Sequence, residues 1–190
     1  MKEDKYIAPL IKKWGHCTVK KHPKSKYFVD IFEAITNQQL SGKAASTIFG
    51  RVRDLCGGKI NPEAILKLPE AELRSAGLSF AKIKYVKDLA ERTKKGELKI
   101  RALDNLSDDE VVAELVAVKG IGRWTAEMFL MFSLGRPDIF PVDDLGIRKG
   151  FEKVTGRKFD KEKSARFAFK HWSPHRTVAS WYLWRSLENR

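Results

Sequence analysis

Apolar residues recur at intervals of three and four positions along most of this chain, which is the period of an amphipathic α-helix. The clearest case is segment 28–40, in which Phe28, Ile31, Phe32 and Ile35 fall on one helix face. No segment gives a convincing strand pattern, and we expect an all-α fold. The same periodicity predicts further helices over residues 43–58, 62–68, 69–77, 81–97, 111–118, 123–135, 143–154 and 175–188.

Several predicted helices carry residues that favour helix ends. Gly57 and Gly58 close the second helix, and Pro62 stands at the start of the third. Ser107 and Glu110 have the spacing of a capping box, which predicts a helix start just before residue 111. The first 27 residues are the most irregular part of the chain, and we assign no helix to them.

Two glycines interrupt the helical pattern between residues 118 and 123. A glycine inside a helix costs about 1 kcal/mol relative to alanine, so Gly120 and Gly122 predict a turn. Both can adopt positive φ and let the backbone approach another surface, while Ile121 turns toward the core. The pattern predicts a helical hairpin; the two glycines alone are also compatible with an ordinary helix–helix turn.

The start of the second hairpin helix is a candidate phosphate-binding site, because its first N–H groups point outward at the positive end of the helix dipole. Lys119, Arg123 and the Thr125 hydroxyl are further candidate phosphate contacts. The 37 Lys and Arg outnumber the 24 Asp and Glu, and the formal net charge of +13 favours nucleic acid as the partner. A solvated lysine-rich surface is the alternative explanation of this charge.

Other features exclude several classes of protein. No apolar run approaches the roughly 18–20 residues that span a bilayer, and the N-terminus lacks a secretory pattern. The only cysteines, Cys17 and Cys56, supply neither a local metal-ligand pair nor a disulfide framework. We therefore expect an intracellular protein with no membrane span and no metal site. The histidines show no metal-ligand spacing either: His16, His22, His171 and His175.

A long stretch resembles a known superfamily. Residues 115–144, LVAVKGIGRWTAEMFLMFSLGRPDIFPVDD, resemble the helix–hairpin–helix and the Gly/Pro-rich loop with its following aspartate in the DNA glycosylase superfamily. The combination of GIGRWTAE with FPVDDLGIR is similar above all to alkylbase glycosylases of the 3-methyladenine DNA glycosylase II type. The resemblance extends over residues 28–190 and includes ITNQQLSGKAAS and SWYLWRSLE.

The resemblance implies two helical subdomains with the active site in the cleft between them. Residues 1–36 plus 145–190 would form a terminal subdomain and residues 37–144 a central one, with the helix–hairpin–helix at 107–134. It also implies double-stranded DNA containing damaged bases as the partner, and a monomeric protein. No cofactor is required, and a monovalent cation held by hairpin carbonyls is compatible with the resemblance.

The superfamily places a catalytic aspartate just beyond the Gly/Pro-rich loop, where this chain offers Asp143 and Asp144. The register of the apolar Ile147, three residues on, favours Asp144 as the catalytic residue and leaves Asp143 as a helix N-cap. Breaking the C1′–N bond leaves positive charge on the sugar, which a nearby carboxylate stabilises while it orients or deprotonates water. Both aspartates as capping residues is the structural alternative.

Aromatic residues match the positions that line the base pocket in these relatives. The resemblance assigns Trp124 and Trp184 to the pocket, and Met128 lies one helical turn after Trp124. Aromatic faces attract a cationic alkylated base through the ring quadrupole. Core packing is the alternative for any tryptophan, and it is our expectation for Trp181 and Tyr182. Lyase members carry a lysine at the position of Trp124, so the resemblance implies a glycosylase without lyase activity.

Segment NQQLS lies where the family places the residue that fills the hole left by an extruded nucleotide. Gln39 is the first candidate wedge and Leu40 the second. Exposed amides without a role are the alternative for Gln38 and Gln39.

The resemblance thus implies a monofunctional DNA glycosylase in base excision repair. It would flip alkylated purines of the N3-methyladenine and N7-methylguanine type out of the duplex and hydrolyse their N-glycosidic bond, leaving an abasic site. One alternative is a non-catalytic helix–hairpin–helix DNA-binding module, which would need Gly120, Gly122 and the charge but not Asp144. Another is a glycosylase for a different lesion, such as uracil, hypoxanthine or ethenoadenine.

Overall fold

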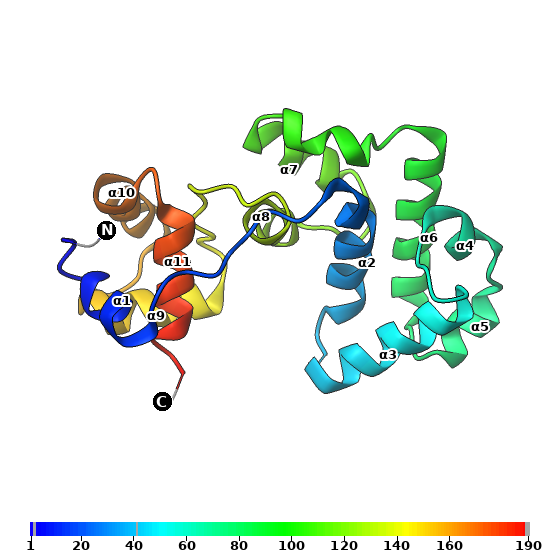
Figure 1. The fold of residues 1–190 in the computed structure, drawn as a ribbon, viewed down its shortest axis with the longest axis horizontal. Coiled ribbons are helices and arrows are strands. Elements are labelled where there is room, and N and C mark those ends of the chain that lie inside the picture. The colour runs from blue at the N-terminus through cyan, green and yellow to red at the C-terminus, as the bar shows by residue number, and fades with distance from the viewer. Residues whose placement is uncertain (2, 41, 189–190) are drawn as a thin grey trace. The chain divides into compact units, whose positions relative to one another are not determined.

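The computed structural model describes residues 1, 3–40 and 42–188, and these residues form helices and turns but no strand, which confirms the all-α prediction (Figure 1). The longest helix, α6, has 16 residues, and no helix of this part of the chain is long and apolar enough to cross a membrane. The helices are α1 (Ala8–Trp14), α2 (Tyr27–Asn37), α3 (Gly42–Leu55), α4 (Pro62–Lys67), α5 (Glu70–Ser75), α6 (Phe80–Lys95), α7 (Asp108–Val116), α8 (Arg123–Phe132), α9 (Leu145–Thr155), α10 (Lys161–Trp172) and α11 (Arg176–Arg185), with 3₁₀ turns at Lys24–Lys26 and Ile100–Asn105.

The chain divides into two compact units. Unit 1 comprises residues 1–21 and 130–190, and unit 2 comprises residues 22–129, so that the second boundary falls within α8. This division differs from the boundaries expected at 36/37 and 144/145. Helix α2 belongs to unit 2 because its buried face packs against α3 and α6.

Unit 2 is built around α6, which contacts α2, α4 and α5 (Figure 1). The helix begins at the side-chain cap of Ser79 and ends at Gly96, which has a left-handed backbone. Its apolar side packs into the unit through the fully buried residues Ile83, Val86, Leu89 and Ala90.

Two lysines of α6 bind the carboxyl ends of neighbouring helices. Lys82 Nζ donates to the carbonyl oxygens of Thr36 (2.8 Å) and Gln38 (2.7 Å), at the end of α2. Lys87 Nζ donates to the carbonyl oxygens of Leu66 (3.3 Å) and Leu68 (2.6 Å), at the end of α4. These carbonyls have no partner within their own helices, so each lysine satisfies a helix end and ties it to α6.

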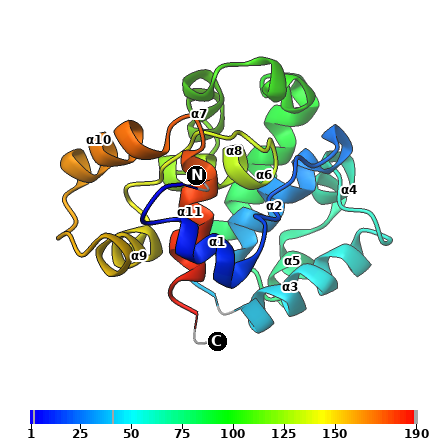
Figure 2. The same ribbon diagram turned by 60° about the vertical axis from the view of Figure 1, so that its left-hand side comes forward.

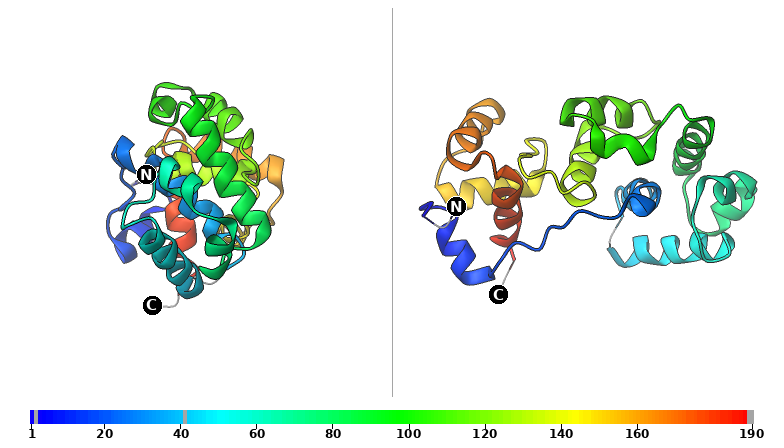
Figure 3. Two further views of the ribbon diagram at one scale, coloured as in Figure 1. Left: turned by 90° about the vertical axis from the view of Figure 1, so that its right-hand side faces the viewer. Right: turned by 45° about the horizontal axis from the view of Figure 1, so that its top comes forward.

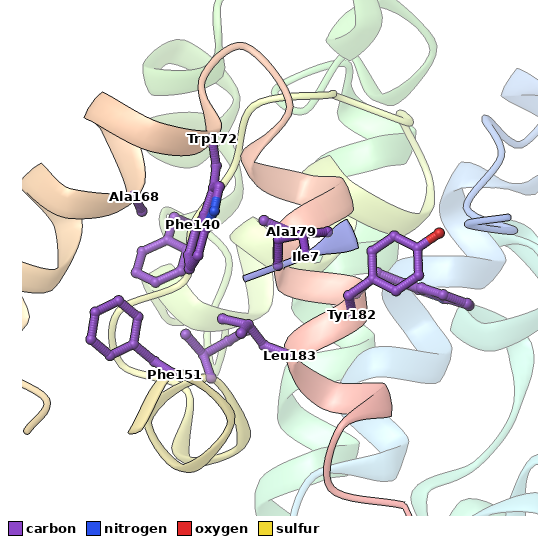
Figure 4. Close-up of a cluster of buried hydrophobic side chains, with 10 residues drawn as sticks. Ile7, Phe140, Phe151, Ala168, Trp172, Ala179, Tyr182 and Leu183 are labelled. Atoms are coloured by element: carbon purple, nitrogen blue, oxygen red, sulfur yellow. The ribbon is translucent and has the colours of Figure 1, made fainter. Parts of the chain in front are cut away.

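Unit 1 packs α9, α10 and α1 around α11. Figure 4 shows its core, in which the ring of Phe151 lies 6.4 Å from that of Phe140 and 6.1 Å from that of Trp172. Helix α9 crosses α11 closely (Figure 3, right). At the crossing, a Cβ on Gly150 would stand 2.5 Å from the carbonyl oxygen of Leu183.

Helices α1 and α10 are absent from the sequence prediction. Helix α1 has only seven residues and packs on α11 (Figure 2), where Ile7 is fully buried and Tyr182 donates a hydrogen bond to the Gly15 carbonyl (2.6 Å). So short a helix is stabilised by packing and not by propensity. Helix α10 does carry a local signal, because the Asp160 side chain accepts from the Lys163 N–H as an N-cap.

We expect Gly150→Ala to lower the free energy of unfolding by about 2–3 kcal/mol, because its methyl group would collide with backbone at the α9–α11 crossing. Gly50→Ala in α3 is the matched control: a Cβ there meets no neighbouring atom within 4 Å, so the helix gains up to about 1 kcal/mol. Denaturant unfolding of the two variants measures both effects. Equal stability of the two variants would contradict the close crossing.

Candidate nucleic-acid interface and active site

The hairpin forms as predicted from α7, residues 117–122 and α8. Ser107 and Glu110 make a complete capping box at the start of α7, with the Ser107 N–H donating to Glu110 Oε2 (2.7 Å). Ile121 is buried, so the tip of the hairpin is anchored to the core of unit 2.

The two hairpin glycines have different roles. Gly120 has φ +79°, and a Cβ on it would lie 2.1 Å from the ring of Tyr85. Gly122 does not have the positive φ that the sequence suggested, and a Cβ on it would meet nothing within 4 Å. Gly120 is therefore required by the fold, whereas exposed Gly122 leaves its backbone open to approach from outside.

Asp88 of α6 binds the hairpin at Lys119. Its Oδ2 accepts from the Lys119 N–H (3.0 Å) and from Arg92 Nε (3.0 Å), and its Oδ1 lies 3.5 Å from Lys119 Nζ. Burial alone would raise the pKa of Asp88, but these hydrogen bonds and charges outweigh it and the pKa is lowered. The ionised carboxylate therefore binds both the backbone and the side chain of the hairpin.

Two predicted cationic contacts are exposed, and the predicted hydroxyl contact is not. The side chain of Lys119 is 68% exposed, and that of Arg123 is 61% exposed while its Nε donates to Glu127 (3.1 Å). Thr125 is only 6% exposed. Its hydroxyl is thus not placed for the phosphate contact predicted from the sequence, because residue 125 lies on the core side of α8.

The turn after α2 carries the candidate wedge residues. Helix α2 ends at Asn37 and not at residue 40, and Gln39 follows with φ +57°. Both Gln39 and Leu40 are exposed. Gln38 is not an idle surface amide, because its Nε2 donates to the hairpin carbonyl of Gly120 (2.9 Å).

Asp144 is the N-cap of α9. Its Oδ1 accepts from the Ile147 N–H (2.7 Å) and from Trp184 Nε1 (2.8 Å). The predicted capping role of Asp143 is wrong, because Asp144 directly precedes the first residue of α9 and Asp143 forms an ion pair with Lys161. The two donors from different helices fix the orientation of the Asp144 carboxylate.

Trp184 contacts both the Asp144 carboxylate and a second aromatic side chain. Its ring is half-buried and lies 5.8 Å from the ring of Phe132. A Cβ on Gly146 would stand 2.6 Å from Trp184 and 3.0 Å from Asp144 Oδ1, so the residue at this position must lack a side chain. Trp181 and Tyr182 are buried, as predicted for core residues.

The other two predicted base-pocket residues lie on α8 in unit 2. Trp124 is 42% exposed, Met128 is partly buried, and both lie on one face of the helix because they are four residues apart. Whether Trp124, Met128 and Trp184 share a pocket stays a prediction, as does the expected cleft.

The loop before Asp144 is anchored by residues that the sequence analysis missed. Asp138 accepts from the Arg176 guanidinium (2.8 and 2.9 Å), the Arg176 N–H (3.1 Å) and the Ser173 hydroxyl (2.8 Å). Thr177 Oγ1 accepts from the Ile139 N–H (3.0 Å). Burial alone would raise the pKa of Asp138, but the bonds from Arg176 and Ser173 outweigh it and the pKa is lowered.

No group of three or more His, Cys, Asp or Glu side chains among residues 1, 3–40 and 42–188 is arranged to hold a metal ion.

Residues 32–175 match the family described as HhH-GPD superfamily base excision DNA repair protein. The chain belongs to the HhH-GPD superfamily. This confirms the resemblance drawn from the hairpin and the following aspartate, and the superfamily match includes Asp144, Trp124 and Gln39 but ends before Trp184.

Relatives within the HhH-GPD superfamily share both sequence and fold. DNA-3-methyladenine glycosylase 1 of Schizosaccharomyces pombe is 37% identical over 86% of this chain and 73% of its own length. A crystal structure of DNA-3-methyladenine glycosidase from Bacillus halodurans superposes with a TM-score of 0.85 at 38% identity, over 97% of this chain and 85% of that one. The S. pombe 3-methyladenine DNA glycosylase Mag1 in complex with abasic DNA gives 0.84 at 34% identity, over 97% and 92%.

The lowered pKa of Asp138 predicts a pH dependence of stability. A carboxyl group whose pKa is depressed in the folded state stabilises the fold above its unfolded pKa of about 3.9, and this contribution is lost as the pH falls through the folded pKa. We expect Asp138→Asn to cost about 2 kcal/mol at pH 7 and progressively less as the pH falls below about 3.9.

Melting curves of Asp138→Asn and the wild type between pH 7 and pH 2 check this expectation. Asp143→Asn is the control, because its ion pair with Lys161 is exposed and contributes little. A deficit of Asp138→Asn that stays constant down to pH 2 would refute the assigned role of the charge.

Proposed function

We propose that this protein is a monofunctional DNA glycosylase that removes alkylated purines, of the N3-methyladenine and N7-methylguanine type, from double-stranded DNA. The observation that carries the proposal is the Asp144 carboxylate, oriented by the Ile147 N–H and the Trp184 indole in a chain of the HhH-GPD superfamily. Two relatives that match most of the chain are named DNA-3-methyladenine glycosylase 1 and DNA-3-methyladenine glycosidase.

Asp144 would act on the sugar of the damaged nucleotide. As the C1′–N bond breaks, the base leaves with the bonding electrons and positive charge develops on C1′ and the ring oxygen. An oriented carboxylate stabilises that charge without reorganisation. It then accepts a proton from the water whose oxygen bonds to C1′, which leaves an abasic site.

The aromatic residues support a cationic substrate. We assign Trp124, Met128 and Trp184 to contact with the base, since an alkylated purine is positively charged and aromatic faces attract cations. Trp124 has no amine, so it cannot form the Schiff base through which lyases cleave the strand. The proposed reaction therefore ends at the abasic site.

The hairpin would hold the DNA backbone. The first N–H groups of α8, a ten-residue helix, lie beside Gly122, where no side chain blocks the approach of a phosphate. Lys119 and Arg123 add positive charge, although both already have carboxylate partners in Asp88 and Glu127.

The proposal requires no cofactor. A monovalent cation at the hairpin would have to share the carbonyls of Val118 and Gly120 with the donors that they already have, Ile121 N and Gln38 Nε2. We also propose that the protein acts as a monomer and that it acts on DNA inside the cell.

The experiment that tests this function incubates the protein with methylated duplex DNA and with duplexes that carry one defined lesion, and identifies the released bases. Release of alkylated purines without strand cleavage is the expected result. Release of uracil, hypoxanthine or ethenoadenine alone would assign another lesion. Salt-sensitive binding without release from any duplex would favour a non-catalytic binding module.

Asp144→Asn is expected to bind lesion duplexes as the wild type does and to release base at least about 100-fold more slowly, because it lacks the charge. Asparagine is as good an N-cap as aspartate, so the start of α9 should remain intact. Single-turnover base release and fluorescence anisotropy separate the two properties. Asp143→Asn is the control, and excision by Asp144→Asn at the wild-type rate would show that the assignment is wrong.

Gly122→Ala is expected to melt at the wild-type temperature but to bind duplex DNA about tenfold more weakly, because its methyl group separates the hairpin backbone from a phosphate. Gly120→Ala should lower the melting temperature, because a Cβ would collide with Tyr85 on a backbone of positive φ. Anisotropy at fixed salt and thermal melting measure both. Unchanged affinity in Gly122→Ala would exclude a close backbone contact at this position.

A further inference from the structure

One side of α6 holds two segments that are far apart in the sequence. Lys82, Tyr85 and Asp88 lie three residues apart on this helix. Lys82 binds the carbonyls of Thr36 and Gln38 at the end of α2. Tyr85 packs against Gly120, and Asp88 accepts from the Lys119 N–H, so the same side of α6 also holds the hairpin.

Gln38 joins the two segments directly. Its carbonyl oxygen accepts from Lys82 Nζ (2.7 Å), and its side-chain Nε2 donates to the Gly120 carbonyl (2.9 Å). The residue is thus bound at its backbone and at the end of its side chain. The turn after α2 has a fixed position relative to the hairpin as a result.

Gln39 follows this double attachment with an unfavourable backbone. Among the described residues it is the only non-glycine with positive φ, at +57°. The turn is closed by the Leu40 N–H, which donates to the Asn37 carbonyl (3.2 Å), and the Gln39 side chain is exposed. Such a backbone persists only where its surroundings impose it, which is common at functional sites.

We propose that Gln38 and Lys82 are positioning residues that hold Gln39 in place to enter the duplex when a nucleotide is extruded. This inference rests on the proposed function. The hairpin would fix the position of the DNA backbone, and the Gln38–Gly120 bond would fix the position of Gln39 relative to it. A turn whose backbone is already in place loses little conformational freedom when its side chain fills the hole in the base stack.

The test compares base release from two substrates. One is a duplex with the lesion in a paired strand; the other has a one-nucleotide gap opposite the lesion, which removes the need to fill a hole. We expect Gln38→Leu and Gln39→Ala each to lower kcat/KM about tenfold on the paired duplex and less than about twofold on the gapped one. Because Gln38 acts through Gln39, the double variant should be no slower than Gln39→Ala.

Lys82→Met and Lys87→Met form the matched pair of variants. Both remove a lysine of α6 that binds two carbonyls at a helix end, but only Lys82 is attached to Gln38. Lys82→Met should lower the ratio of activity on paired to gapped substrate, whereas Lys87→Met should lower stability alone. Equal ratios for the two variants, or multiplicative effects of Gln38→Leu and Gln39→Ala, would overturn the inference.

A second measurement does not depend on base release. A duplex carries 2-aminopurine beside a tetrahydrofuran abasic analogue, and insertion of Gln39 should change the fluorescence when the wild type binds. Gln38→Leu should reduce this change while the melting temperature stays above that of the assay. If the wild type gives the signal but releases no base, the catalytic proposal fails and the positioning role stands; if the wild type binds without the signal, the positioning role fails.

Discussion

The unpaired backbone groups at the ends of short helices are the constraint on which this structure depends. Every helix begins with N–H groups and ends with carbonyls that have no partner within it, and a chain of short helices has many of them. Here the side chains that satisfy these groups also build the candidate site. Asp144 caps α9, Lys82 binds the end of α2, and Asp88 takes the Lys119 N–H of the hairpin.

Because Asp144 is both a helix cap and the candidate catalytic group, its carboxylate is well oriented. A cap residue has its side chain directed at its own helix, and Trp184 binds the same oxygen of Asp144 from a second helix. Upstream, Asp138 attaches the preceding loop to the start of α11 through Arg176. The segment that carries Asp144 is therefore fixed by contacts on both sides of this residue in the sequence.

The helices and the hairpin could be predicted because they have local signals, namely apolar periodicity and the Ser107–Glu110 capping box. The choice of Asp144 as the candidate catalytic residue came from the resemblance, through its register with Ile147, and its catalytic role stays a prediction. Thr125 was predicted to contact a phosphate but is buried. The apolar Phe129, one helical turn later, could have indicated this, because both residues lie on the same buried side of α8. The roles of Gln38, Asp88 and Asp138 could not be predicted, because each binds a group more than 30 residues away and no local pattern specifies such a contact.

The absence of side chains at Gly146 and Gly150 has a consequence for how this scaffold can diversify. Both positions lie where α9 meets residues of α11, and a single methyl group at either would collide with Trp184 or with the Leu183 backbone. Directed evolution toward other damaged bases would therefore find few tolerated changes along this contact. Exposed positions of α8, such as 124, offer more freedom, so new specificities should accumulate there first.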